Sequence, residues 1–98
     1  MPLSRIAQAL SAAREVKVAG GRIDFLAGYA GRFANHAAAT GIEVKIKGGK
    51  RAIHRQCAAY CGDPRIGHLV VVAGLALALP AQMHGKPVTI VEIGRAWL

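Results

Sequence analysis

The chain has 98 residues, of which 53% are hydrophobic and 18% are charged. A chain of this length builds one domain around one modest core, and this one is too apolar to stay disordered. We expect a single domain spanning residues 1–98. Thirteen Lys and Arg against five Asp and Glu give a net charge of +8, which favours nucleic acid or an acidic protein surface as the partner.

The sequence predicts a cytoplasmic protein that does not enter a membrane. Only two cysteines are present, fewer than disulfide-rich secreted domains use. The first residues lack the pattern of a signal peptide, and the longest apolar run, Leu69 to Leu79, is too short to span a bilayer.

Two helices and two strands are expected in the first half of the chain. Ser4 can cap a helix that runs to Arg14, and residues 15–18 alternate as a strand. Asp24 can cap a second helix that stops at Thr40-Gly41. Its apolar face would hold Leu26, Ala30, Phe33 and Ala37. Residues 42–47 then alternate between apolar and charged, which is typical of a half-buried strand.

The second half is less regular. Gly48-Gly49 is a hairpin signal, so residues 50–53 are open to interpretation as a short return strand before a helix that begins near His54. Asp63-Pro64 predicts a further helix that runs to Leu79, although the triple valine at 70–72 favours a strand. Residues 88–93 alternate as a last strand.

The predicted order is α-β-α-β-(β)-α-α-β, with the central β in doubt. Helices that alternate with strands form layers. The expected fold class is therefore α+β, a small two-layer sandwich in which helices cover one face of a short mixed sheet. The strands at 42–47 and 88–93 should be neighbours or near-neighbours.

Two families share parts of this pattern. Gly28-Tyr29-Ala30-Gly31, Thr40-Gly41 and Val44-Lys45-Ile46 resemble the GxxG loop, helix and strand of KH domains. That resemblance implies that the GxxG grips a single-stranded nucleic-acid backbone. The element order of residues 15–93 resembles HPr-like phosphocarrier proteins. A phosphocarrier needs a histidine at the start of its first helix, where this chain has Ile23 and Asp24, so phosphotransfer is not implied.

The clearest functional pattern is a basic cluster with no acid between Glu43 and Asp63. Its members are Lys45, Lys47, Lys50, Arg51 and Arg55. Clustered flexible cations bind phosphates with a strong dependence on salt. No aromatic residue accompanies them, so base stacking is not expected. The alternative is an edge strand that lysines protect from aggregation.

A second pattern is a possible zinc set. Two histidines and two cysteines are spaced so that three of them share a helix face; they are His54, Cys57, Cys61 and His68. The alternative is that the cysteines are small buried thiols and the histidines lie on the surface. We favour the alternative and predict no cofactor.

The sequence thus predicts a small basic protein that binds nucleic acid, RNA included, or an acidic protein surface through contacts of the backbone-phosphate type. The alternative is a structural or assembly subunit, of the kind that phages and mobile elements encode, that forms a homodimer through the apolar segment 69–79. Catalysis is not indicated, because the five acids lie far apart in the sequence.

Overall fold

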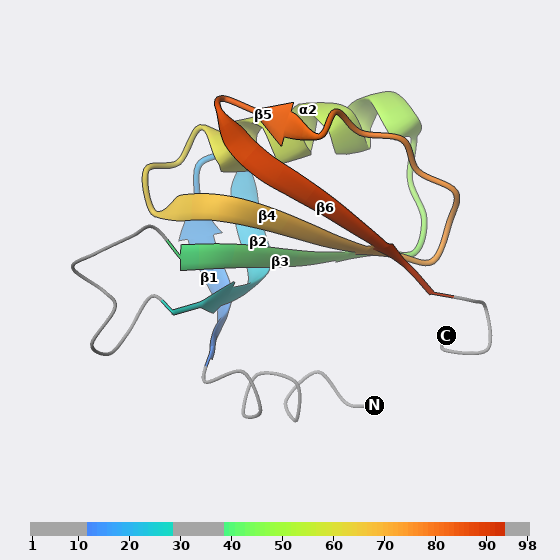
Figure 1. Ribbon diagram of the computed structural model, residues 1–98. Coiled ribbons are helices and arrows are strands. Elements are labelled where there is room, and N and C mark those ends of the chain that lie inside the picture. Colours follow the sequence, from blue (N-terminus) through green and yellow to red (C-terminus); the bar gives the residue numbers. More distant parts are fainter. Residues whose placement is uncertain (1–11, 29–38, 94–98) are drawn as a thin grey trace.

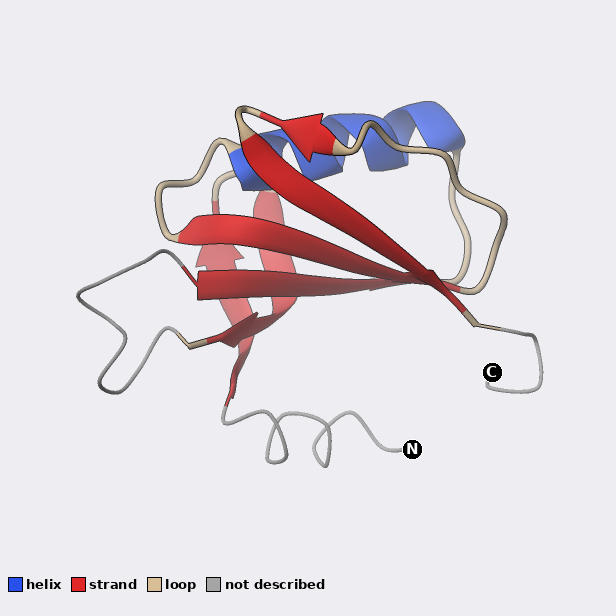
Figure 2. Cartoon of the chain, in the orientation of Figure 1, coloured by secondary structure: helices blue, strands red, loops and turns tan. Residues whose placement is uncertain are grey.

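A computed structural model describes residues 12–28 and 39–93. The described elements follow in chain order: β1 (Ala12–Val18), β2 (Gly21–Ala27), β3 (Ala39–Lys45), α2 (Lys50–Cys61), β4 (Ile66–Ala73), β5 (Gln82–Met83) and β6 (Lys86–Glu92). Within these ranges α2 is the only helix, and Figure 2 shows it lying across the strands.

The strands form one mixed sheet in the order β1-β2-β3-β4-β6-β5. β1, β2 and β3 pair antiparallel, whereas β3, β4 and β6 pair parallel, and β5 forms a short antiparallel hairpin with β6. α2 is the crossover that two parallel strands need, and it carries the chain from β3 to β4 (Figure 1). The carboxyl end of β3 is therefore followed directly by the start of α2.

The core lies between α2 and the sheet. α2 buries Ile53, Cys57, Tyr60 and Cys61, which recur at helical spacing. Beneath them β4 contributes Leu69 and Val71, both fully buried. The intervening Val70 and Val72 point to the other face and are half-buried.

The β1–β2 hairpin is irregular at one position. Its pairing runs from Arg14–Phe25 directly to Val16–Ile23, and Glu15 between them has a φ of 51°. On β2 the pairing with β3 stops at Phe25. Asp24 therefore lies where the backbone ladder between β2 and β3 is interrupted, and its side chain is available to the edge of β3.

The predicted two-layer sandwich with several helices is wrong, and so is the α+β class. The described part of the chain is mostly β-sheet and has one short helix. The helix expected from Asp24 is wrong at its start, because residues 24–27 belong to β2. Residues 29–38 of that helix, which include Tyr29, Ala30 and Gly31 of the KH-like GxxG, lie outside the described residues, as do residues 4–11 of the first predicted helix; residues 12–14 are in β1.

The helix predicted from Asp63 to Leu79 is also wrong. Residues 66–73 form β4, and residues 74–81 form a loop. A continuous apolar run is typical of a parallel strand buried on both faces, and the three valines prefer a pleated strand to a helix. The proposed return strand at 50–53 is wrong as well, because α2 begins at Lys50.

The remaining strand predictions are confirmed over most of their length. Residues 15–18 lie in β1, residues 42–45 lie in β3, and residues 88–92 lie in β6, whereas the predicted ends at 46–47 and 93 lie outside the strands. β3 and β6 are near-neighbours with β4 between them. No helix within the described ranges is long and apolar enough to cross a membrane.

Candidate functional site

A hollow of about 460 Å³ lies where β3 gives way to α2. One wall is α2, with Arg55 and Gln56, and another is the β3–α2 loop, with Lys47 and Gly49. The tip of the β1–β2 hairpin closes it at Gly20.

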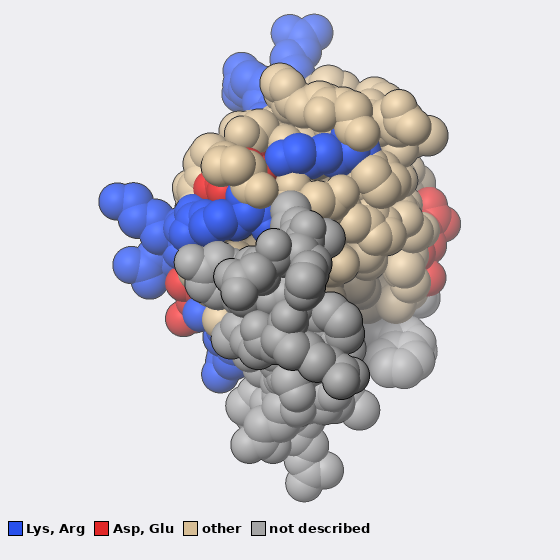
Figure 3. All heavy atoms as spheres, turned by 60° about the vertical axis from the view of Figure 1, so that its left-hand side comes forward, with Lys and Arg blue, Asp and Glu red and all other residues tan. Residues whose placement is uncertain are grey.

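Three of the five predicted basic residues line this hollow, namely Lys45, Lys47 and Arg55. The other two, Lys50 and Arg51, are exposed in the first turn of α2 and do not line it. The structure thus gathers part of the predicted cluster around one concave surface. Figure 3, which brings forward the left-hand side of Figure 1, shows Lys and Arg side chains gathered along the left of that view.

The start of α2 adds to the positive potential of the hollow. Its N-cap is Gly49, which has no side chain to accept from the first amides, and the first turn contains no acidic residue. The first amide groups of a helix have no partner within the helix, and the helix dipole makes this end positive. Backbone and side chains therefore both favour an anion here.

Two carboxylates meet beside the hollow. Glu43 on β3 is only 4% exposed, and the main-chain N–H of Asp24 donates to its Oε1 at 3.1 Å. In return, the N–H of Val44 donates to Asp24 Oδ2 at 2.7 Å. These two side-chain bonds replace the missing backbone ladder between β2 and β3, and they hold both acids at the same break in the sheet.

Glu43 is surrounded by polar partners. The Tyr60 hydroxyl lies 3.1 Å from Glu43 Oε2 and 3.0 Å from the carbonyl oxygen of Arg22. Burial raises the pKa of Glu43 above its ordinary value, and the Asp24 carboxylate adds to the rise, whereas a hydrogen bond from Lys45 lowers it. Burial, together with Glu43, raises the pKa of Tyr60.

Lys45 joins the carboxylates to the hollow. Its Nζ lies 3.0 Å from Glu43 Oε2, and the same residue lines the hollow. Glu43 and Lys45 alternate with Val44 on β3, so both project from the side of the sheet that α2 covers. An acid pair, a lysine and an anion-attracting concave surface are thus contiguous.

The four residues of the possible zinc set are not brought together. Cys57 and Cys61 are fully buried on the side of α2 that faces the sheet, and His54 is exposed on the same helix. His68 lies on the opposite face of β4 from Leu69, where its Nε2 is 2.8 Å from Thr89 Oγ1. In the ranges that the structure describes, no group of three or more His, Cys, Asp or Glu side chains is placed to hold a metal ion.

Burial raises the pKa of the Cys57 thiol to about 11. Burial also raises the pKa of Cys61. Both cysteines are free, and a thiol that stays protonated and buried is a poor nucleophile and a poor metal ligand. Their place in the core fits the interpretation as packing residues.

The carboxylate pair was missed because sequence separation says nothing about sheet neighbours. Asp24 and Glu43 are 19 residues apart and meet only because β2 and β3 pair. The alternation at 42–47 also misled us about the faces, because it predicts Glu43 in solvent and Ile42 in the core. In the structure Glu43 is buried toward α2, and Ile42 is half-buried on the other face. The available signal was a lone Glu two residues before a Lys on an otherwise apolar strand.

Comparison of the chain with protein-family models, with curated proteins and with solved structures finds no match.

Proposed function

We propose that this protein binds nucleic acid in the basic hollow and hydrolyses a phosphodiester bond there with the help of a divalent cation. The proposal keeps the predicted nucleic-acid partner and adds a reaction that the sequence alone did not indicate. The observation that carries it is the meeting of Asp24 and Glu43 at one break in the sheet, with Lys45 between them and the hollow.

The chemistry of the residues suits a hard divalent cation. Mg²⁺ is commonly held by only one or two carboxylates, with water and substrate phosphates completing its coordination. Asp24 and Glu43 would supply two such carboxylates, with the cation taking the place of donors that bond their oxygens in this structure, Lys45 among them. The ammonium of Lys45 would face the phosphate and stabilise the negative charge that grows on it during attack. Lys47 and Arg55 would hold neighbouring phosphates.

The reaction balances with water as the only co-reactant. A water oxygen forms a bond to phosphorus, and the bond from phosphorus to the leaving sugar oxygen breaks. One proton of the water is lost to solvent or to the phosphate, and the leaving oxygen takes up a proton. A divalent cation held by Asp24 and Glu43 would supply charge neutralisation and would lower the pKa of the attacking water.

The competing interpretation is a purely structural network around Glu43. A buried carboxylate beside a second carboxylate is costly, and a raised pKa of this origin is more frequent at functional sites than elsewhere. A lysine is present as its counter-ion, yet that lysine also lines the hollow.

We propose the reducing cytoplasm as the place of action, since two unpaired buried thiols suit it.

Charge reversal at Lys47 in the β3–α2 loop and at Lys50, the first residue of α2, should weaken binding to every sequence. We expect Lys47→Glu with Lys50→Glu to lower the affinity for single-stranded and duplex nucleic acid alike, because the side chains bind phosphates. The slope of log affinity against log salt should flatten by about one unit for each phosphate that is no longer bound. Fluorescence anisotropy over a salt series measures both, and cleavage of the same probe should fall in parallel.

A control for this variant is Ala81→Glu with Gln82→Glu, which lowers the net charge by two units where the Lys47/Lys50 variant lowers it by four. Both positions are exposed near the edge of the sheet opposite the hairpin. The control adds acids away from the hollow and should keep most of the affinity and the full salt slope. Unchanged binding by the loop variant at low salt would remove the hollow from the proposal.

The homodimer and the assembly role remain predictions, but the surface that we propose for the contact between the two copies changes. Segment 69–79 is not a helix, but its strand carries Val70 and Val72 on the face away from α2, and Val91 of β6 is 44% exposed. We propose this face as the contact between two copies. Sedimentation equilibrium should then show a dimer at high micromolar concentration, and a single species near 10.3 kDa would contradict it.

A further inference from the structure

The β1–β2 hairpin carries basic side chains that the proposed site does not use. Lys17 and Arg22 are exposed and lie directly opposite each other in the strand pairing. The neighbouring pair, Val16 and Ile23, packs in or against the core. Since side chains alternate along a strand, Lys17 and Arg22 both project from the outer face of the hairpin.

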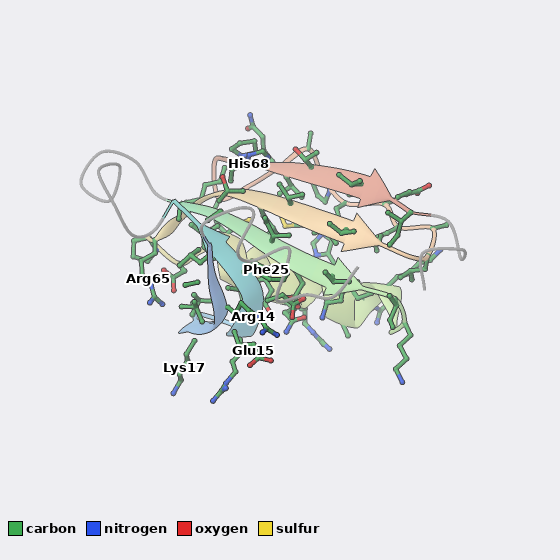
Figure 4. All side chains as sticks on the ribbon, turned by 90° about the horizontal axis from the view of Figure 1, so that it is seen from below. Arg14, Glu15, Lys17, Phe25, Arg65 and His68 are labelled. Atoms are coloured by element: carbon green, nitrogen blue, oxygen red, sulfur yellow. The ribbon has the colours of Figure 1, made fainter. Side chains whose placement is uncertain are left out.

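Arg14 belongs to the same face. It pairs with Phe25, which in turn pairs with Ile42 on the side of the sheet away from α2. The regular alternation of β1 is broken at Glu15, which has a φ of 51°, so residues three apart fall on one face. Figure 4 shows Arg14 close to Glu15, and Lys17 farther along the hairpin. Irregular positions of this kind re-aim side chains and are frequent near functional sites. We call Arg14, Lys17 and Arg22 the outer basic face.

The outer basic face is an unbalanced arrangement of charge. Like charges directly opposite on paired strands destabilise a sheet. None of the three side chains has a carboxylate within ion-pair distance among residues 12–28 and 39–93. Glu15, the nearest acid in sequence, is exposed beside them. A polyanion on this face would relieve the repulsion.

The hairpin tip links this face to the hollow. Gly20 lines the hollow and packs so closely on α2 that a Cβ there would lie 2.7 Å from that of Ala59. Lys17 and Arg22 follow on the strands just below the same tip. A chain of phosphates that leaves the hollow over the tip therefore comes directly to the outer basic face.

We infer that the outer basic face is a second phosphate-binding surface for the same nucleic acid whose reacting strand lies in the hollow. The inference rests on the proposed function and extends its footprint along the backbone. It predicts that a long ligand makes phosphate contacts that a short one does not reach, and that these contacts add to the salt dependence.

The test compares Lys17→Gln/Arg22→Gln with the unmutated protein, using a short single-stranded oligonucleotide and a long duplex as probes. The bonds that Arg65 and Tyr60 make to residues 17 and 22 go to main-chain carbonyls, so the fold should be kept. For the duplex we expect an affinity loss of about tenfold and a salt slope smaller by about two units. For the short oligonucleotide we expect no change.

The matched control is Ala81→Glu/Gln82→Glu, which changes the net charge by the same two units at exposed positions near the opposite edge of the sheet. It should keep the duplex slope. Equal loss with this control, or equal loss for both probes, would overturn the inference. If the Lys47/Lys50 reversal weakens binding and the hairpin variant does not, the proposed function stands and the second surface falls. If the unmutated protein binds neither probe, both fall.

Discussion

Glu43→Gln should abolish phosphodiester cleavage and leave the protein folded. The amide keeps the size and one acceptor oxygen of the side chain but removes the charge that a divalent cation needs. A cation supplies several kcal/mol of transition-state stabilisation, and each 1.4 kcal/mol, roughly, is a factor of ten in rate, so we expect a loss of about 10³-fold or more. Gel analysis of an end-labelled oligonucleotide under single-turnover conditions measures it.

The same variant should lose less free energy of unfolding than its loss of cleavage rate represents. Burial disfavours the ionised form of Glu43, but the amide leaves Lys45 without the carboxylate that lies 3.0 Å from its Nζ, so we expect the free energy of unfolding to fall by about 2 kcal/mol, which urea unfolding measures. The matched control is Glu92→Gln on β6, which makes the same chemical change at an exposed position and should leave the rate unaltered. Cleavage that survives in Glu43→Gln would show that the carboxylate pair is structural.

Asp63→Ala should produce the largest loss of stability. Asp63 is 4% exposed and accepts bonds from the N–H of Ala19 at 2.9 Å and from the Arg65 N–H and guanidinium at 2.8 to 3.1 Å. It therefore ties the β1–β2 turn to the turn between α2 and β4. Removing one partner of a buried ion pair typically costs 3–5 kcal/mol, and we expect about 3 kcal/mol here, since Arg65 is partly exposed. Urea unfolding at neutral pH measures the loss.

The pH dependence of stability provides a second measurement on Asp63. The hydrogen bond from Arg65, followed by the two main-chain N–H groups, holds the pKa of Asp63 well below its ordinary value. A depressed folded-state pKa stabilises the protein above the unfolded value of about 3.9, and this contribution is lost as the pH falls further. Asp63→Asn should lack this loss, so the two unfolding curves should converge in acid. Parallel curves at all pH values would contradict the role of Asp63.

Local patterns predicted the strands that are short and bounded by turn residues. In the strands at 15–18, 42–45 and 88–92, side chains alternate between apolar and polar, and a glycine or proline lies within a few residues of an end. The alternation and the turn residues therefore indicate the same strands. Helix α2 was recognised from Ile53, Cys57, Tyr60 and Cys61 at helical spacing. Only its first turn was misread, because Gly48-Gly49 is a hairpin signal and here leads into the helix instead.

The failures come from strand pairing that local signals do not carry. The helix expected at 63–79 is β4, whose partner strands are distant in sequence, and the segment from Asp24 is β2, which pairs with the adjacent β1 and also with β3. Capping residues and apolar runs are local signals, whereas a parallel strand such as β4 is stabilised by β3 and β6 on both sides. The same holds for the site. Lys45, Lys47 and Arg55 are close in sequence and were found, but the Asp24–Glu43 pair depends on the pairing of β2 with β3.

The most direct measurement is cleavage of nucleic acid by the unmutated protein, freed of metal and then given Mg²⁺, Mn²⁺ or a chelator. An end-labelled single strand and an end-labelled duplex serve as substrates, with Glu43→Gln purified in parallel to reveal any contaminating nuclease. The proposed function predicts shortened products with either cation, none with the chelator and none from Glu43→Gln. Intact substrate under every condition, from a protein that unfolds cooperatively, would contradict it.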